Sequence, residues 1–530
     1  MTVKRMNSFL STGRPPRVAG ARLAAVTLAL TAVFVSCSPS FQAKACTTDA
    51  DCGSSLICVQ QAGPGVCRSP ADAPLKIGMS APVSGPSQDL GTEMKKGVTL
   101  AFDVQNGSGG IRGRQLLLQF RDDQYVPSAA EAAARDLLDV QPVKDQPARC
   151  PTTTTSLVAG TDPVGSGLIN KGPNGVLALL GNVGTPTMVR TAPLAVETQT
   201  LFFGAFTGSA KMLRDGASGP CGKYIFNVRA SYGNEARATT EFFLKLGVPD
   251  SAHIVSFDQN DTFGQAGYDG LVNAWTALKG APPPVNPGDT ANPIKRLRYT
   301  RDDQSSVPAQ IAAATAYLTS LLASDTAPTV NVGIFMTDTY GPATNFIKGV
   351  RDWHYAASNT DATTRLKLTF SNVSFVGPNS LAQRLKDLGQ VNTPTGPKAY
   401  SDAVFVSQVV PNYQSDNSDA VRDYKKALDA AGLTPSFTSL EGYLAARVFI
   451  AGLLVHQGPY TAEALINTFE HLPNQALGLG ANAGFAPCGA DLCKTQHSYS
   501  KSVWGTALSP DGTFTNRYFW TDGTPLQLFE

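Results

Sequence analysis

The sequence predicts an α/β protein of two lobes, preceded by a small cysteine-rich segment. Beyond residue 74, short apolar runs alternate with segments of helical period, which is the pattern of parallel sheets covered by helices on both faces. The expected strands are too many for one sheet of ordinary size, so two α/β lobes are favoured. Ahead of the lobes, four closely spaced cysteines lie in a stretch rich in Asp, Gly, Ser and Thr.

Each apolar run is expected to form a buried strand and each periodic segment a helix. The strands are expected at 75–80, 115–120, 176–181, 201–205, 252–257, 331–336 and 403–410. The helices are expected at 91–105, 128–139, 186–197, 234–246, 263–278, 307–322, 342–352, 419–431, 439–456 and 461–471. Stretches rich in Pro, Gly, Ser and Thr indicate surface insertions at 140–175, 279–303 and 391–401.

The composition excludes several classes of protein. Apolar residues make up 42% of the 530, which is enough for sizeable cores and excludes a wholly disordered chain. Charged residues make up only 16%, against roughly 25% in an average globular protein. This low charge content argues against a coiled coil and against a nucleic-acid binder with a broad basic face.

The first 36 residues have the character of a secretory signal peptide. They carry five Lys or Arg and no acid, followed by the apolar run LAAVTLALTAVFVS at 23–36, which is too short to span a bilayer permanently. The run ends at Cys37, and an apolar stretch, a small residue and then Cys resembles the bacterial lipoprotein lipobox. The resemblance implies cleavage before Cys37 and its acylation, so that residues 37–74 hold a lipid-anchored tether and the cysteine-rich knot. An ordinary signal peptide with an incidental cysteine is the alternative.

The remaining eight cysteines are an even number, which indicates disulfides in an oxidising compartment. They are Cys46, Cys52, Cys58, Cys67, Cys150, Cys221, Cys488 and Cys493. The first four contain no C-x-x-C pair, so a two-disulfide knot is favoured over a zinc site, with three connectivities open. The last two can close a local loop, and the middle two remain to pair by elimination.

The chain shows no catalytic or cofactor motif. H-E-x-x-H, G-x-S-x-G and the phosphate loop G-x-x-x-x-G-K-[ST] are all absent, and the five histidines are scattered. We therefore expect neither an enzyme nor a bound metal or cofactor.

Polar residues follow two consecutive expected strands. Thr185 is placed to cap the next helix, with Pro186 at its first position, and Ala205 and Thr207 form a second such junction. Free backbone N–H groups at a helix start favour a carboxylate, and ligands of open α/β sheets bind outside the carboxyl ends of the strands. Each junction alone is typical of a plain cap, but two in succession favour an anion pocket, which Ser84 at another strand end could line.

Short motifs occur in a fixed order from residue 75 to the end of the chain. They are Ile77-Gly78 with Pro82-Val83-Ser84-Gly85, Gly97-x3-Ala101-Phe102, Asn106-x2-Gly109-Gly110-Ile111-Arg112-Gly113-Arg114, Asp122-Asp123-x-Tyr125, Asp261-x-Phe263-Gly264, Val409-Val410-Pro411, Ser439-Leu440-Glu441-Gly442-Tyr443 and Val503-Trp504-Gly505-Thr506. As an ordered set they resemble the leucine/isoleucine/valine-binding family of type I periplasmic binding proteins.

The resemblance implies two Rossmann-like lobes with parallel sheets, joined by three hinge crossings and closing on a small molecule. Lobe 1 would comprise 75–225 and 410–495, and lobe 2 would comprise 226–409 and 496–530. In the family's amino-acid binders the first lobe holds the ligand carboxylate, and Thr185, Ala205 and Thr207 fall at those motif positions. An aromatic residue of the second lobe covers the ligand, and Tyr340 falls near that position.

One departure from the family pattern concerns the charge of the ligand. The family's acidic residue for the ligand ammonium follows a Gly-Pro pair, where this chain has Asn379. An amide does not neutralise an ammonium, and a buried unpaired charge costs several kcal/mol. Either Asp338 or Glu441 supplies the charge, or the ligand is not an α-amino acid. Asp338 could instead cap a helix, and Glu441 could be a first-turn acid of its own helix.

The sequence thus predicts an extracytoplasmic solute-binding lipoprotein anchored in the cell envelope. It would capture a small amino-acid-like or carboxylate ligand (an amino acid, an amide or an organic acid) by lobe closure and deliver it to an ABC permease in the membrane. No nucleic-acid partner is expected. The alternative is a ligand-sensing or surface protein-interaction lipoprotein, because transport needs no cysteine-rich knot.

Overall fold

The computed structural model describes residues 44–47, 49–53, 56–59, 65–69, 73–143, 169–209, 219–488 and 493–529. The chain divides into two compact units, Met1–Arg68 and Ser69–Glu530. The predicted signal peptide and the predicted lipid site Cys37 lie outside the described residues. The predicted pairing of Cys150 with Cys221 depends on Cys150, which also lies outside them.

The first unit is built around a three-stranded antiparallel sheet and two disulfides. The strands β1 (Ala45–Cys46), β3 (Gly65–Arg68) and β2 (Ile57–Val59) pair in that order. The disulfides join Cys46 to Cys58 and Cys52 to Cys67. The two-disulfide knot is therefore confirmed, and the structure selects one of its three possible connectivities.

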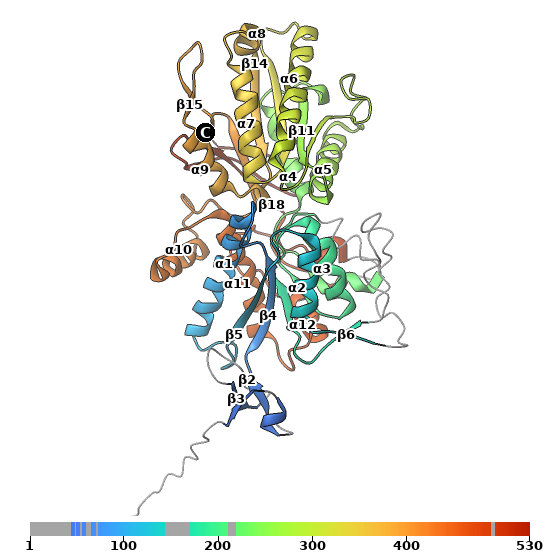
Figure 1. Cartoon of the computed structure of the whole chain (residues 1–530), viewed down its shortest axis with the longest axis vertical. Coiled ribbons are helices and arrows are strands. Elements are labelled where there is room, and N and C mark those ends of the chain that lie inside the picture. The colour runs from blue at the N-terminus through green and yellow to red at the C-terminus, as the bar shows by residue number, and fades with distance from the viewer. Residues whose placement is uncertain are drawn as a thin grey trace, which may run out of the picture. The chain divides into compact units, whose positions relative to one another are not determined.

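In the second unit, lobe 1 contains a five-stranded, wholly parallel sheet of order β10-β9-β8-β4-β5. Helices α1 and α11 pack together on one side of this sheet, and α2 and α3 pack together on the other (Figure 1). The strands and helices of lobe 1 are β4 (Leu75–Ala81), α1 (Gln88–Gly107), β5 (Leu116–Asp122), α2 (Pro127–Leu137), β6 (Val140–Pro142), β7 (Ile169–Lys171), β8 (Ala178–Leu180), α3 (Thr185–Glu197), β9 (Leu201–Phe203), β10 (Ile225–Phe226), α10 (Asp419–Ala431), α11 (Phe437–Val455), α12 (Ala462–Glu470) and α13 (Cys493–Gln496).

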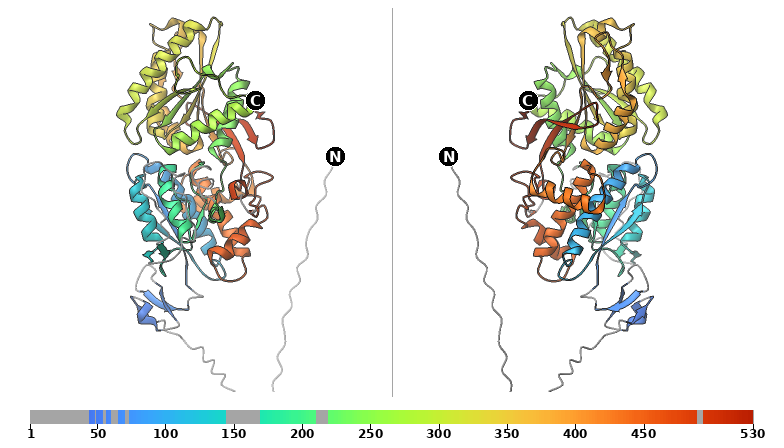
Figure 2. Two further views of the ribbon diagram at one scale, coloured as in Figure 1. Left: turned by 90° about the vertical axis from the view of Figure 1, so that its right-hand side faces the viewer. Right: turned by 90° about the vertical axis from the view of Figure 1, so that its left-hand side faces the viewer.

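Lobe 2 contains an eight-stranded sheet of order β12-β11-β13-β14-β17-β18-β19-β20, parallel as far as β17 and antiparallel beyond it. Its strands and helices are α4 (Tyr232–Lys245), β11 (Ile254–Gln259), α5 (Thr262–Lys279), β12 (Lys295–Tyr299), α6 (Val307–Ser324), β13 (Val330–Thr337), α7 (Tyr340–His354), α8 (Thr360–Arg365), β14 (Leu366–Asn372), α9 (Pro378–Leu388), β15 (Gln390–Val391), β16 (Lys398–Ala399), β17 (Val404–Gln408), β18 (Ser502–Leu508), β19 (Phe514–Thr521) and β20 (Gln527–Leu528). Figure 2 shows the sheets lying between helices, so the predicted α/β fold class is confirmed.

The structure corrects the prediction of a surface insertion at 279–303. That stretch contains β12, the edge strand of the lobe 2 sheet. Its sequence KRLRY alternates basic and apolar residues, because only one face of an edge strand is buried. The prediction considered only continuous apolar runs, which are typical of strands covered on both faces, and so it did not include this strand.

Three chain segments connect lobe 1 to lobe 2, and two of them are hydrogen-bonded side by side. The first follows β10, the second follows β17, and the third precedes β18. Asn227 and Tyr499 form part of a parallel bridge between the first and third segments: the Asn227 N–H donates to the His497 carbonyl, and the Tyr499 N–H donates to the Asn227 carbonyl, both at 2.8 Å. The Cys488–Cys493 disulfide, predicted as a local closure, lies just before the third segment.

Helix α11 of lobe 1 is buried along most of its length. Its length and apolar composition would suit a membrane span, but 78% of the apolar window is buried within the structure, as in the core helix of a soluble protein. It approaches α1 so closely that two glycines lie at the contact. A Cβ added at Gly97 would lie 1.9 Å from the Ser439 carbonyl oxygen, and one at Gly442 would lie 2.5 Å from the Met94 carbonyl oxygen.

Gly97→Ala is expected to lower the free energy of unfolding by about 1–3 kcal/mol, because the added methyl group meets backbone atoms that cannot rotate away. Gly107→Ala at the end of the same helix is the matched control, since no atom lies within 4 Å of the position that its methyl group would take; it should be neutral or slightly stabilising. Urea denaturation measures both variants. Equal stabilities would contradict the close approach of α1 and α11.

Candidate ligand-binding cleft

The carboxyl ends of the parallel strands of both lobes lead into one region between the lobes. Lobe 1 contributes the turns after β4, β5, β8 and β9, and lobe 2 contributes those after β11, β12, β13 and β14. Strand ends of open α/β sheets are the usual ligand site, because backbone groups there are not used by the sheet. Ring contacts and hydrogen bonds join the two lobes across this region, so the structure represents a closed arrangement of the lobes.

Thr185 and Thr207 meet on the lobe 1 side of the cleft. Their hydroxyl oxygens lie 2.7 Å apart, and both side chains are fully buried. Ala205 belongs to the same turn through its carbonyl, which accepts the Thr207 N–H at 2.9 Å. The structure therefore brings together the three residues that the sequence predicted for a carboxylate, at the N-terminal end of α3.

The cap of α3 differs from the prediction. Gly184 is the capping residue and Thr185 is already the first residue of the helix, without a side-chain cap bond. Gly184 has φ +95°, a conformation that a side chain would strain, and a Cβ there would lie 2.2 Å from the Tyr125 ring. Thr185 therefore makes no capping hydrogen bond, and its hydroxyl pairs with that of Thr207 instead.

Five buried aromatic side chains pack against one another between the two lobes and form an aromatic wall beside the threonine pair. Tyr125 and Phe206 come from lobe 1, and Tyr232, Phe263 and Phe375 from the hinge and lobe 2. Their ring centroids lie 4.8–6.1 Å apart in successive pairs, and all five side chains are buried. The prediction gave none of them a role in the site, although Tyr125 and Phe263 lie in motifs that carry the family resemblance.

Arg229 lies beside this wall in the first connecting segment. Its guanidinium is 5.3 Å from the Phe206 ring centroid and forms ion pairs of 2.8 Å with Glu235 and 3.3 Å with Glu441. Glu235 also accepts the Ser374 N–H and the Ser407 hydroxyl at 2.7 and 2.6 Å. Two carboxylates thus face one guanidinium, and burial raises the pKa of Glu441 to about 7, with Arg229 opposing the shift and Glu235 reinforcing it.

Asp338 lies within lobe 2 at the end of β13 and is completely buried. Neither of its carboxylate oxygens makes a hydrogen bond in the described part of the chain, and burial holds its pKa well above the ordinary value, with Asp258 adding to the shift. It does not cap α7, whose capping residue is Thr339. Burial disfavours the charged form of Asp338, whereas Glu441 has Arg229 as an ion-pair partner, so Glu441 is better suited to meet an ammonium.

Tyr340 and Asn379 lie at the mouth of the cleft. The Tyr340 hydroxyl donates to the Pro86 carbonyl of lobe 1 at 2.7 Å, and its ring lies against Arg384. The Asn379 amide donates to the Tyr413 hydroxyl at 2.7 Å and accepts the Phe437 N–H at 3.1 Å. Both residues therefore contact lobe 1 or a connecting segment, which is the position of groups that hold the lobes closed.

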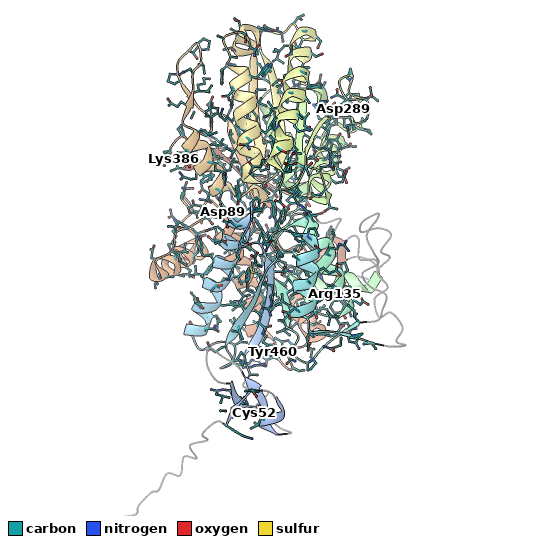
Figure 3. The ribbon with its side chains drawn as sticks, in the orientation of Figure 1. Cys52, Asp89, Arg135, Asp289, Lys386 and Tyr460 are labelled. Atoms are coloured by element: carbon teal, nitrogen blue, oxygen red, sulfur yellow. A yellow bond between two sulfur atoms is a disulfide. The ribbon has the colours of Figure 1, made fainter. Side chains whose placement is uncertain are left out.

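Ser84 contributes to the lobe 1 side of the same mouth. Its hydroxyl donates to the Asp122 carboxylate at 2.6 Å. Nearby, Asp89 at the start of α1 accepts a hydrogen bond of 2.8 Å from the Ser380 hydroxyl of α9. Figure 3 shows Asp89 at the border between the two lobes. Ser84 is thus engaged within lobe 1, and contact across the mouth is made by other residues.

A sequence profile described as periplasmic binding protein matches residues 74–144 and 172–491. The chain belongs to the periplasmic binding protein family. It is similar to Leu/Ile/Val-binding protein homolog 3 of Brucella melitensis, 39% identical over 70 residues that make up 13% of this chain and 19% of that relative. The match thus spans about a fifth of that relative's length, and the expected family is confirmed.

Solved structures agree with this assignment over most of the binding protein. A possible leucine/isoleucine/valine-binding protein from Rhodopirellula baltica matches with a TM-score of 0.62 and 26% identity, covering 84% of this chain and 97% of that one. A fatty acid ABC transporter substrate-binding protein from Thermomonospora curvata matches with a TM-score of 0.57 and 14% identity, covering 86% and 93%. The second likeness shows the fold alone.

Tyr340→Phe is expected to favour the open arrangement of the binding protein. The change removes the hydrogen bond to the Pro86 carbonyl and the long one of 3.5 Å that the hydroxyl accepts from the Asp89 N–H. Together they are worth about 1 kcal/mol, which corresponds to a roughly fivefold shift of an open–closed equilibrium. Small-angle scattering of the ligand-free protein measures the shift as a larger radius of gyration. Tyr317→Phe is the control, because its hydroxyl donates to the Ala252 carbonyl at the same distance of 2.7 Å but within lobe 2. Equal radii of gyration for both variants would contradict the role of Tyr340 in holding the lobes closed.

Glu441→Gln is expected to remove part of the pH dependence of stability. Because burial raises the pKa of Glu441 from 4.5 to about 7, the folded protein keeps a proton in this window that the unfolded chain releases. Stability therefore falls as pH rises from about 4.5 to 7, by on the order of 3 kcal/mol from this group. Urea denaturation of both proteins at several pH values should show the variant gaining stability relative to wild type across the window. Parallel curves would contradict the assignment.

Proposed function

We propose that this protein is an envelope-anchored, extracytoplasmic solute-binding protein that captures a small carboxylate ligand and delivers it to an ABC importer. The observation that carries the proposal is the pair of buried hydroxyls of Thr185 and Thr207 at the N-terminal end of α3. Hydroxyl donors and the positive end of a helix dipole together favour a ligand carboxylate. Membership of the periplasmic binding protein family supports delivery to a transporter.

The charges in the cleft bear on the class of carboxylate. Glu235 and Glu441 together exceed the single positive charge of Arg229, and the raised pKa of Glu441 indicates that its anion lacks full compensation. A ligand ammonium beside Glu441 would restore the balance. Amino-acid-like ligands are therefore included beside simple organic acids, and a similar protein is named for leucine, isoleucine and valine.

Cys37 is the proposed anchor. It follows a basic segment and an apolar run in the order of a lipoprotein signal. Cys37→Ser should move the protein from the membrane fraction to the soluble fraction and abolish incorporation of labelled fatty acid. Cys46→Ser is the contrasting variant, since that cysteine forms a disulfide and its loss should leave fatty-acid incorporation intact. Labelling of the Cys37→Ser protein would contradict the anchor.

Ligand binding is tested by a thermal-shift screen against amino acids, amides and organic acids. A ligand at 100 times its Kd should stabilise the protein by about 2.7 kcal/mol. Thr185→Val and Thr207→Val should each weaken a carboxylate ligand by about tenfold, since each removes a hydroxyl from the pocket. Thr319→Val is the control, because that hydroxyl donates to its own helix at an exposed position of α6. No shift with any member of the panel, or unchanged affinity in both pocket variants, would contradict the proposal.

The alternative is a sensor or a surface-interaction protein with the same fold. The cysteine-rich unit favours this alternative. Its two disulfides stabilise a small unit that is separate from the two lobes proposed to capture the ligand, and a partner-binding role would account for it. Uptake of the bound ligand by cells separates the two functions. An importer subunit is required for uptake, whereas a sensor is not.

A further inference from the structure

The Cys488–Cys493 disulfide differs in its surroundings from the Cys52–Cys67 disulfide of the cysteine-rich unit. Its two cysteines are 5 positions apart in sequence, against 15 for Cys52–Cys67. A disulfide that closes a shorter loop restricts the unfolded chain less, so it stabilises the folded protein less. Cys488 and Cys493 are both partly exposed, whereas Cys52 and Cys67 are both buried. The Cys488–Cys493 bond is thus the more accessible of the two to a thiol in solution.

A histidine ring lies against one sulfur of the Cys488–Cys493 disulfide. The Nε2 atom of His497 is 3.1 Å from the Cys488 Sγ and 3.1 Å from the Glu470 Oε1. The Nδ1 atom of the same ring is 3.1 Å from the Ile225 carbonyl oxygen. A carbonyl and an ionised carboxylate accept hydrogen bonds and do not donate them. Both ring nitrogens therefore carry a proton, and the ring is an imidazolium.

The fold fixes the position of this imidazolium. The His497 side chain is completely buried, and its ring stacks on Phe226 of β10 with the centroids 3.8 Å apart. The His497 carbonyl accepts the N–H of Asn227 in the first connecting segment at 2.8 Å. Glu470 of α12 is held as well, because the same Oε1 atom accepts the Cys488 N–H at 3.2 Å. The Nε2 proton therefore stays directed at the carboxylate and at the Cys488 sulfur.

A proton donor in this position makes one sulfur the better leaving group. In thiol–disulfide exchange an incoming thiolate attacks one sulfur and the other departs, and stabilising the departing sulfur accelerates the reaction. His497 contacts the Cys488 sulfur, so Cys488 is the leaving group and Cys493 is the sulfur that is attacked. The Glu470 carboxylate opposes a second negative charge at this place, which favours departure of Cys488 as a protonated thiol.

We propose that Cys488–Cys493 is a thiol–disulfide exchange site that a dithiol reductant reduces. A thiolate of the reductant attacks the Cys493 Sγ and forms a mixed disulfide; the Cys488–Cys493 bond breaks, and Cys488 departs with the Nε2 proton of His497. The second thiol of the reductant gives its proton to His497, and its sulfur attacks the first sulfur of the reductant. Cys493 is released as a thiolate and takes a proton from water. The reductant ends as a disulfide, and the protein gains two electrons and two thiols.

The rate of reduction by dithiothreitol is the first test. The full chain is treated at pH 7, portions are alkylated with iodoacetamide at successive times, and mass spectrometry of the digest measures the labelling of each cysteine. Cys488 and Cys493 are expected to be labelled roughly tenfold faster than Cys52 and Cys67, which act as the internal control. Equal rates, or slower labelling of Cys488 and Cys493, would overturn the exchange site.

The second test asks which sulfur is attacked, which exposure and loop length alone do not decide. Glutathione, a monothiol, stops at the mixed disulfide, and fragmentation of the digested peptide locates it after an acid quench. In the wild-type protein glutathione is expected on Cys493 in roughly fivefold excess over Cys488. His497→Gln should abolish this preference. His471→Gln should preserve it, because His471 is exposed and its Nδ1 contacts the Asn467 carbonyl at 2.8 Å.

Either of two results contradicts the role of His497. One is an equal distribution of glutathione over both cysteines in the wild-type protein, and the other is a preference for Cys493 that survives His497→Gln. If circular dichroism shows that His497→Gln does not fold, Glu470→Gln replaces it, since loss of the carboxylate removes the charge that keeps the ring protonated. The preference for Cys493 should then fall in Glu470→Gln, and an unchanged preference would overturn the proposal.

Discussion

The buried guanidinium of Arg229 is the interaction on which the geometry of the cleft depends. It pairs with Glu441 on a helix of lobe 1 and with Glu235 on a helix of lobe 2, and it lies over the Phe206 ring. A buried charge is tolerated only when it is paired and hydrogen-bonded, so all three charged groups must keep their positions together. Arg229 lies in a connecting segment, and its two ion pairs hold α4 of lobe 2 and α11 of lobe 1 next to that segment. The residues at the mouth of the cleft take no part in these pairs, so the mouth can open while the pairs remain.

Closure of the lobes then depends on other contacts, which lie at the mouth of the cleft. Tyr340 reaches the Pro86 carbonyl and Ser380 reaches Asp89, so that each lobe supplies groups to the other at the mouth. Between the Arg229 ion pairs and the mouth lie the aromatic wall and the hydroxyl pair of Thr185 and Thr207. The region between the lobes thus combines a polar lobe 1 face with packed aromatic side chains, an arrangement suited to orienting a small acid and excluding water from it.

Most of the fold could be predicted from the sequence because burial leaves a local pattern. The run at 331–336 is apolar without interruption since β13 is covered on both faces, and it appears as Val330–Thr337 in the structure. The edge strand β12 could not be found in this way, because its Lys and Arg residues alternate with Leu and Tyr. The antiparallel pairing of β18 with β17 depends on a meeting of segments that are distant in sequence, which a local pattern does not encode.

The candidate site was predictable only in part, for the same reason. Thr185 and Thr207 follow apolar strands and open polar turns, a local signal that located them. Arg229 gave no signal, since its partner Glu441 is more than 200 residues away in the sequence and their meeting arises only from the packing of α11. Tyr125 lay in a recognisable motif, but its place in the aromatic wall follows from an unusual backbone conformation, φ +63°, and from Gly184 opposite its ring.

The central claim is that a carboxylate held by lobe 1 closes lobe 2 upon it. The most direct measurement is the distance between nitroxides placed at the exposed residues Asp103 of α1 and Lys386 of α9 (Lys386 is labelled in Figure 3). Double electron–electron resonance determines it with and without a ligand found in the thermal-shift screen. The account predicts a broad distribution for the free protein that narrows to its shorter component when the ligand binds. A distribution unchanged by saturating ligand would contradict closure as the mechanism.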